Sequence, residues 1–104
     1  MYIGVFEWDI QKAIANYEKH GVSFEQAVTA FGDPNGLDGE DIAHSQQEHR
    51  RKRLARSVTG HILLVIYTLR RKYHEKETIR LISARQASRK ERQAYARFAD
   101  RLLR

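Results

Sequence analysis

The sequence predicts a single α+β domain, and three observations support that class. Two capped helical segments follow a short apolar opening, β-type segments fill the middle of the chain, and a third capped helical segment ends it. The predicted element order is β-α-α-β-β-β-α, with the strands in an antiparallel meander because short turns join them. The 104 residues fit one domain over residues 1–104, since domains typically take roughly 100–150 residues.

The first half of the chain predicts a short strand followed by a helix. The opening YIGVFEW alternates like a strand and ends at Trp8, and Asp9 then has the position and the side chain of a helix N-cap. Apolar residues recur at helical spacing up to a glycine that suits a helix end: Ile10, Ala13, Ile14, Tyr17 and then Gly21.

A second helix is predicted to begin directly after the first. Ser23 and Gln26 have the spacing of a capping box, and the GDPNG segment of residues 32–36 ends the helix with turn-forming residues. Near the C-terminus, Ser88 and Glu91 repeat the capping-box spacing at the start of a third helix.

The middle of the chain predicts strands. Residues 37–44 and 53–57 are weak candidates, whereas the apolar run within 61–69 is typical of a central strand and 78–84 gives the last one. The polar residues 70–77 between the last two strands predict the tip of a long hairpin.

Basic residues are concentrated in the second half of the chain. Residues 1–48 contain two Lys or Arg against nine Asp or Glu, whereas residues 49–104 contain 17 against four. This separation predicts a surface that meets a polyanion, most commonly nucleic acid. The alternative is an ordinary solvated basic surface.

The composition argues against several other classes. The absence of cysteine excludes a disulfide framework, a thiolate metal site and a cysteine nucleophile. No apolar run approaches the roughly 20 residues of a membrane helix, and the N-terminus lacks a signal-peptide pattern, so we expect a cytoplasmic protein without membrane contact. His44 and His49 lack a third ligand, so neither a metal site nor a cofactor is expected.

Five segments, in order along nearly the whole chain, resemble the BrnT family. They are FEWD (6–9), KHGVSFEQA (19–27), FGDP (31–34), DIAHS (41–45) and RLISAR…ERQAY (80–95). The resemblance implies a RelE-like fold and a toxin of a bacterial type II toxin–antitoxin module that cleaves RNA and inhibits translation. It also implies neutralisation by a BrnA-like antitoxin encoded beside the toxin, with operator DNA reached only through that antitoxin.

Metal-independent RNA cleavage needs a base, an acid and cations that stabilise charge on phosphorus. Arg80 and Arg85 are the candidate phosphate ligands, because guanidinium donors match phosphate oxygens and stay charged. Five residues apart, they point to opposite faces of a regular strand, so both reach one phosphate only if the strand bulges near 83–84. Otherwise at least one of them pairs with an acid such as Glu7 or Glu91.

His44 in the DIAHS segment is the candidate for proton transfer, because its ring titrates near neutrality, with a reference pKa of about 6.5. A surface histidine that caps the loop is an equal alternative. The predicted RNA contacts, which include the lysine implied by the resemblance, are Lys12, Arg53, Arg89, Arg92 and Tyr95. The helical spacing of Tyr95 also fits a core position.

Two other functions fit the same residues. The chain could be a non-catalytic nucleic-acid-binding module that acts only within an autoregulatory complex. It could also be a protein-interaction domain whose basic half docks an acidic partner.

Overall fold

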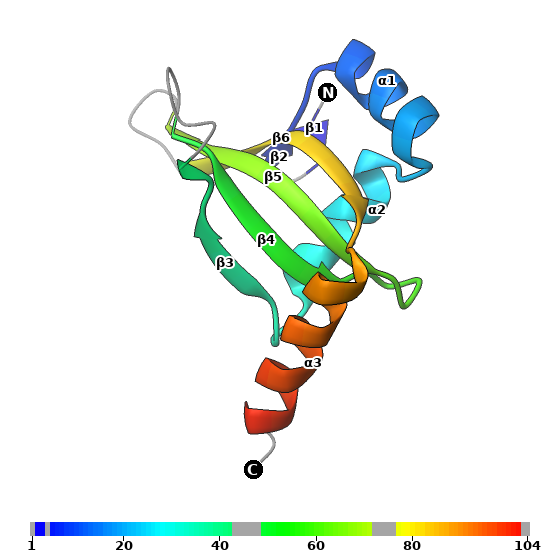
Figure 1. Ribbon diagram of the computed structural model, residues 1–104. Coiled ribbons are helices and arrows are strands. Elements are labelled where there is room, and N and C mark those ends of the chain that lie inside the picture. The colour runs from blue at the N-terminus through cyan, green and yellow to red at the C-terminus, as the bar shows by residue number, and fades with distance from the viewer. Residues whose placement is uncertain (1, 4, 43–48, 72–76, 103–104) are drawn as a thin grey trace.

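The computed structural model describes residues 2–3, 5–42, 49–71 and 77–102. It confirms the α+β class, with a helical hairpin near the N-terminus, a sheet and a C-terminal helix (Figure 1). The helical elements are α1 (Ile10–His20), α2 (Phe24–Thr29), the short 3-10 turn η1 (Ala30–Gly32) and α3 (Arg89–Leu102). The strands are β1 (Tyr2–Ile3), β2 (Phe6–Glu7), β3 (Leu37–Glu40), β4 (Arg51–Arg56), β5 (Ile62–Arg71) and β6 (Glu77–Gln86).

Within the described residues, the strands form one sheet in the order β1-β2-β6-β5-β4-β3. β3 to β6 make the predicted antiparallel meander, with four strands where the predicted element order had three. The opening segment, predicted as one strand, is instead two short strands, and β2 runs parallel to β6. A parallel pair needs a long connection, and the helical hairpin with three intervening strands supplies it.

The strands in the middle differ from the predicted ranges at their ends. β3 stops at Glu40, and residues 43 and 44 of the predicted strand lie outside the described residues. β5 and β6 extend into the polar 70–77 segment, where Arg71 still pairs with Glu77. The polar side chains do not end β5 and β6, because strand pairing depends on hydrogen bonds between main-chain groups, which continue through Arg70 and Thr78.

The cap residues of α1 are those predicted. The Asp9 carboxylate accepts hydrogen bonds from the N–H groups of Gln11 at 2.8 Å and Lys12 at 3.2 Å. Gly21 ends the helix with a φ of 70°, in the left-handed region that glycine adopts without strain.

At the start of α2 the capping box is only half formed. The Ser23 hydroxyl accepts from the N–H of Gln26 at 3.0 Å, as predicted. The side-chain amide of Gln26, however, donates to Thr59 at 2.8 Å and to Ser57 at 3.3 Å instead of returning to Ser23. Gln26 thereby ties the helical hairpin to the turn between β4 and β5.

The helices cover opposite faces of the sheet, with α2 behind it and α3 in front of it in Figure 1. We call these the hairpin face and the α3 face. The buried core of the hairpin face is Trp8, Val22, Phe24, Ala27, Ala30, Ala55, Leu63, Val65, Tyr67, Leu81 and Ala84. A smaller cluster under α3 contains Leu54, Ala87 and Tyr95.

An asparagine attaches α1 to the sheet. Asn16 is buried, and its amide donates to the carbonyls of Ala84 at 2.8 Å and Val22 at 3.0 Å and accepts from the N–H of Ala84 at 3.0 Å. The large members of the apolar stripe on α1 are about half exposed: Ile10 51%, Ile14 49% and Tyr17 58%. Hydrogen bonds through Asn16 thus replace part of the apolar packing that the helical spacing predicted.

Neither a membrane-spanning helix nor a group of metal ligands occurs among the described residues. No helix in that part of the chain is long and apolar enough to cross a membrane. No three His, Asp or Glu side chains of the described residues come together as metal ligands.

Candidate active site

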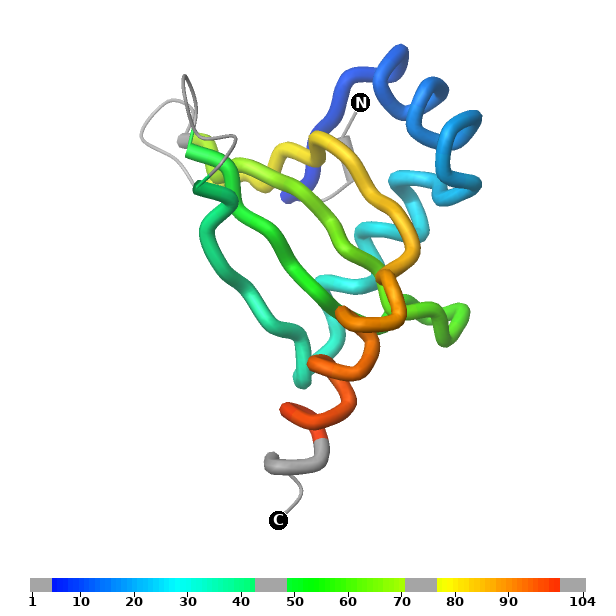
Figure 2. Tube along the Cα trace, in the orientation of Figure 1, coloured from blue at the N-terminus to red at the C-terminus, as the bar shows by residue number. Residues whose placement is uncertain are grey.

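A bulge in β6 brings Arg80 and Arg85 to the same face of the sheet. Arg85 lies opposite Leu64 of β5, and Arg80 lies opposite Thr68, four residues further along that strand. The register shift between the two strands leaves Ile82 as an extra residue in β6, whose trace is irregular there in Figure 2. Directly opposed residues share a face, as do residues four apart on a strand, so both arginines belong to the α3 face.

The two arginines nevertheless do not hold a common site, because their backbone positions are separated along the strand and their guanidinium groups contact different carboxylates. Four residues of a strand span about 13 Å. Each guanidinium also has a carboxylate partner: Nη1 of Arg80 lies 3.8 Å from Oε1 of Glu7, and Arg85 donates to both oxygens of Glu91 at 2.8 and 3.0 Å. The structure contains both of the acidic partners that the sequence offered as the alternative.

Arg80 lies at the side of the sheet where β2 joins β6. The parallel register of these strands places Glu7 directly beside Arg80, and Glu7 is 2% exposed. A carboxylate removed from water needs a cation or hydrogen bonds, so Arg80 contributes to holding Glu7 in the fold. The Arg80 side chain is 24% exposed, which leaves part of it accessible from solvent.

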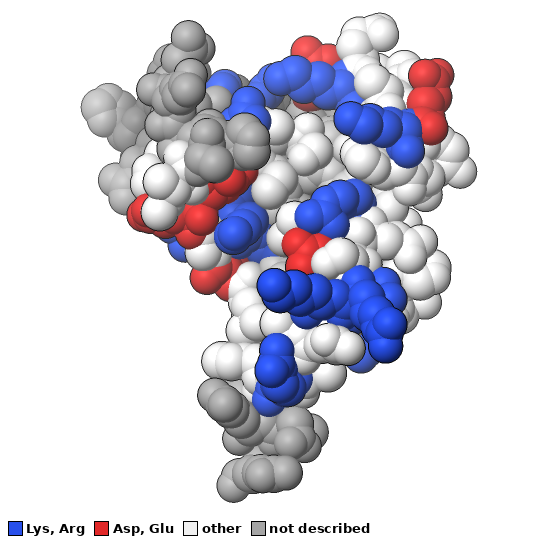
Figure 3. All heavy atoms as spheres, in the orientation of Figure 1, with Lys and Arg blue, Asp and Glu red and all other residues white. Residues whose placement is uncertain are grey.

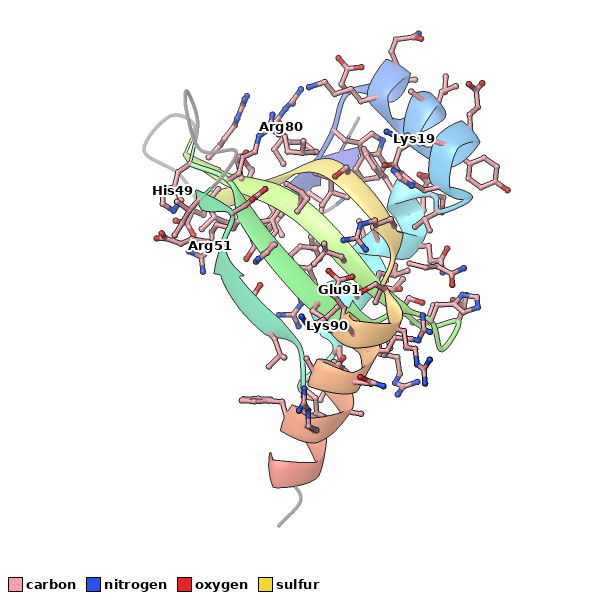
Figure 4. All side chains as sticks on the ribbon, viewed as in Figure 1. Lys19, His49, Arg51, Arg80, Lys90 and Glu91 are labelled. Carbon is pink, nitrogen blue, oxygen red and sulfur yellow. The ribbon has the colours of Figure 1, made fainter. Side chains whose placement is uncertain are left out.

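A cavity of about 410 Å³ lies on the α3 face between the sheet and the start of α3. This size is within the range of small-ligand sites. Figure 3 shows basic and acidic side chains side by side on this face, and Figure 4 shows Glu91 in front of the sheet at the start of α3. The cavity is lined by Asp41, Arg50, Lys52, Leu64, Ile66, Ser83, Arg85 and Glu91.

Glu91 joins the cavity to the first turn of α3. Its carboxylate accepts from the N–H of Ser88 at 2.8 Å, while the Ser88 hydroxyl accepts from the N–H of Glu91 at 3.2 Å, which confirms the predicted capping box. The Arg85 guanidinium and, after it, the Ser88 N–H lower the pKa of Glu91 to about 2 against the opposing effect of burial. Donation to Glu91 in turn raises the pKa of Arg85.

We expect the ionised Glu91 carboxylate to stabilise the protein, and we expect acid to remove this stabilisation by protonating it. Its pKa is lower in the folded protein than the ordinary value of 4.5, so its contribution is complete above pH 4.5 and is lost as the pH falls towards about 2. Because solvent reaches the pair, the contribution is on the order of 1–2 kcal/mol. Urea unfolding at pH 7 and pH 3 should show a smaller pH dependence in Glu91→Gln than in the wild type; an equal dependence would contradict this assignment.

Two of the predicted RNA contacts lie inside the protein. Arg53 is 9% exposed on the hairpin face, and it donates to the carbonyls of Ala30 at 3.0 Å and Asp33 at 2.7 Å and to the Asp38 carboxylate at 2.5 Å. Tyr95 is 4% exposed, and its hydroxyl donates to the Asp33 carboxylate at 2.6 Å. Burial and this hydrogen bond raise the pKa of Tyr95. Both positions fit a structural role, and neither residue lines the cavity.

The remaining predicted residues are spread over the surface. Lys12 is exposed on α1, away from the cavity lining. Arg89 and Arg92 are exposed on the first turn of α3, where Arg92 donates to a main-chain carbonyl at 2.8 Å. His44 lies outside the described residues, three positions after Asp41, which lines the cavity.

The basic segment 49–56 was expected to contribute to RNA affinity, but Arg53 was its only residue named as a contact, whereas Arg50 and Lys52 line the cavity. Strand alternation puts Lys52 and Arg53 on opposite faces of the sheet: Lys52 lies opposite Ile66 on the α3 face, whereas Arg53 lies opposite the buried Val65. Basic residues occupy both alternating sets of this segment, so the sequence pattern could not tell which set faces outward.

Comparison with known proteins adds independent information. The crystal structure of the Brucella abortus ribonuclease toxin BrnT is similar to this structure with a TM-score of 0.50 and 22% sequence identity, covering 81% of this chain and 96% of that chain. A family model described as the ribonuclease toxin BrnT of type II toxin–antitoxin systems matches residues 8–91. No curated protein sequence matches the chain.

The fold and the matched region define the class of the protein as a ribonuclease toxin of a type II toxin–antitoxin system, a class that acts with an antitoxin partner. All eight residues that line the cavity fall within the matched range. The chain belongs to the BrnT family, as its sequence motifs predicted.

Proposed function

We propose that the chain is an endoribonuclease that cuts RNA by internal attack of the ribose 2′-hydroxyl, without a metal, in the cavity on the α3 face. The observation that carries this proposal is the position of Arg85: in a chain of a ribonuclease family, its guanidinium lies in the wall of a cavity large enough for a small ligand. Arg50 and Lys52 add positive charge to the same wall.

The reaction needs no group from outside the protein and the RNA. A base removes the proton of the 2′-hydroxyl, the 2′-oxygen bonds to phosphorus, and the bond from phosphorus to the 5′-oxygen breaks as an acid protonates that oxygen. The products are a 2′,3′-cyclic phosphate and a 5′-hydroxyl. Charge builds up on the phosphoryl oxygens in the transition state, where fixed cations lower the barrier most.

Arg85 is the residue that stabilises this charge. Its two donors bind the Glu91 carboxylate in the resting protein, and a phosphate presents oxygens to which the same planar pair of donors can bind. Arg80, about 13 Å away along the strand, contacts a different part of the RNA strand. His44 is the residue that we assign to proton transfer, as the base at the 2′-hydroxyl or the acid at the 5′-oxygen.

The exposed residues Lys12, Arg89 and Arg92 supply the salt-dependent and sequence-independent part of RNA affinity. Cleavage of RNA by the free toxin inhibits translation. A BrnA-like antitoxin neutralises the toxin, and operator DNA is reached only through that antitoxin.

Incubation of the purified protein with RNA in the presence of EDTA tests the proposal. We expect cleavage to fragments with 2′,3′-cyclic phosphate ends, and no cleavage of a matched strand with 2′-deoxyribose at every position. Intact RNA that only shows a salt-dependent mobility shift would instead identify a non-catalytic binding module. Activity that disappears in EDTA and returns with a divalent cation would contradict the metal-independent mechanism.

A further inference from the structure

An apolar groove between α1 and the start of α2 is not used by the proposed function. Its volume is about 470 Å³. Figure 1 shows α1 at the margin of the molecule, beyond the edge of the sheet. The groove is lined by Trp8, Ile10, Ala13, Ile14, Tyr17, Glu18, Ser23, Phe24 and Glu25.

The exposed apolar residues of this groove form a continuous stripe. Ile10, Ile14 and Tyr17 follow the i, i+4, i+7 spacing of one helix face, and each is about half exposed. Single exposed apolar residues are ordinary, but a contiguous stripe beside a groove marks a contact surface. This spacing is also how helices anchor one another when an amphipathic helix lies in a groove.

The charges around the groove indicate what kind of partner it fits. In the cavity on the α3 face, Arg50, Lys52 and Arg85 outnumber the acids Asp41 and Glu91. Among the described residues, the charged groups that line the groove are Glu18 and Glu25, with no basic residue to offset them. The two acids would repel RNA. They would also face each other unfavourably if two copies of the groove met, because like charges across an interface weaken association.

We propose that the groove is the docking site of the antitoxin, occupied by an amphipathic helix whose apolar stripe is flanked by Lys or Arg. The inference rests on the antitoxin partnership of the proposed function, and it is independent of RNA cleavage. The groove and the cavity share no lining residue. A helix in the groove therefore anchors the antitoxin away from the cavity lining, and neutralisation is the task of another part of the antitoxin.

Calorimetric titration with the antitoxin encoded by the adjacent open reading frame tests this inference. Ile14→Asp and Tyr17→Ser should each weaken binding tenfold or more, which corresponds to at least 1.4 kcal/mol. Phe98→Asp is the matched control, because Phe98 is 42% exposed on α3, outside the groove, and its replacement should leave the affinity unchanged. Glu18→Lys should weaken binding, whereas Glu77→Lys, an exposed acid on β6, should not.

Circular dichroism checks that each variant is folded, and Tyr17→Ser carries the test alone if Ile14→Asp does not fold. Unchanged affinity of the groove variants, or equal weakening by the Phe98 control, would overturn the docking site. A dimer of the chain alone that Tyr17→Ser converts to a monomer would identify a second copy as the occupant and overturn it too. If the wild type does not bind the antitoxin, both the antitoxin partnership and the docking site are wrong. RNA cleavage tests the other part of the proposed function separately, because every isolated groove variant should cleave RNA at the wild-type rate.

Discussion

Replacement of Arg85 by alanine is expected to lower the rate of RNA cleavage about a hundredfold or more. Loss of one fixed donor to the charge that develops in a transition state typically costs roughly 10²–10³ in rate. Arg85 has this role because its guanidinium lines the cavity and presents there a planar pair of donors, which Glu91 occupies in the resting protein and a phosphate would take over. Cleavage by purified variants of equal folded fraction, with EDTA present, measures the effect.

Three other variants separate loss of the cation from other effects. Lys12→Ala removes a charge from exposed α1 and should lower the rate far less than Arg85→Ala. Arg85→Lys keeps the charge without the planar pair of donors, so we expect an intermediate rate. Glu91→Gln breaks the ion pair but keeps Arg85, and it should retain more activity than Arg85→Ala. Growth arrest at matched expression should follow the same ranking, and wild-type toxicity of Arg85→Ala would reject the proposed site.

Replacement of Arg53 by alanine is expected to lower the free energy of unfolding by about 2–3 kcal/mol, because Arg53 is buried and its loss leaves main-chain acceptors unsatisfied. Its carboxylate partner Asp38 is 33% exposed, so water can replace part of that ion pair. The variant leaves two main-chain carbonyls and the Asp38 carboxylate without their guanidinium donor. It also removes the contact of the guanidinium with the Phe31 ring, whose centroid lies 5.4 Å away. Because small domains have only about 5–15 kcal/mol of stability, thermal denaturation should show a large fall in Tm.

Lys52 is the matched control for this change, because it is the neighbouring basic residue of β4, is exposed and faces the other side of the sheet. Lys52→Ala should change stability by no more than about 0.5 kcal/mol. If Arg53→Ala instead melts like the wild type and loses RNA affinity, the interpretation of Arg53 as an RNA contact is right and its structural role is wrong.

Local signals in the sequence predicted the helices and the meander well. Asp9, Gly21, Ser23 and Ser88 mark helix ends because each satisfies, or allows, hydrogen bonds within its own few residues. The apolar run of β5 likewise marks a central strand, whose neighbours in the sheet are the strands that adjoin it in the sequence. The resemblance to the BrnT family, also carried by short segments, was confirmed by the family model that matches residues 8–91.

Features set by distant parts of the chain could not be predicted in this way. The parallel pairing of β2 with β6 joins strands about 70 residues apart. Glu7 could be offered as one possible acid partner, but the strand pairing that places it beside Arg80 has no local signal. The bulge at Ile82 decides the face of Arg80; the sequence left open a bulge near 83–84, and only the pairing with β5 shows that β6 has one and where it lies. Arg53 was interpreted as an RNA contact because it belongs to a basic segment. Its acceptors come from η1, from the turn after η1 and from β3, all distant in the sequence.

Because Ile82 is an extra residue in β6, the number of residues in that strand determines which side chains face each side of the sheet. A deletion of Ile82 would restore a regular alternation and turn the preceding half of β6 over. Arg80 would then point towards the aliphatic interior, and Ile79, which now packs against that interior, would point outward. Substitutions in β6 leave every side chain on its own face of the sheet, whereas the insertion or deletion of one residue moves part of the strand's side chains to the opposite face. The strand should therefore tolerate substitutions much better than single-residue insertions or deletions.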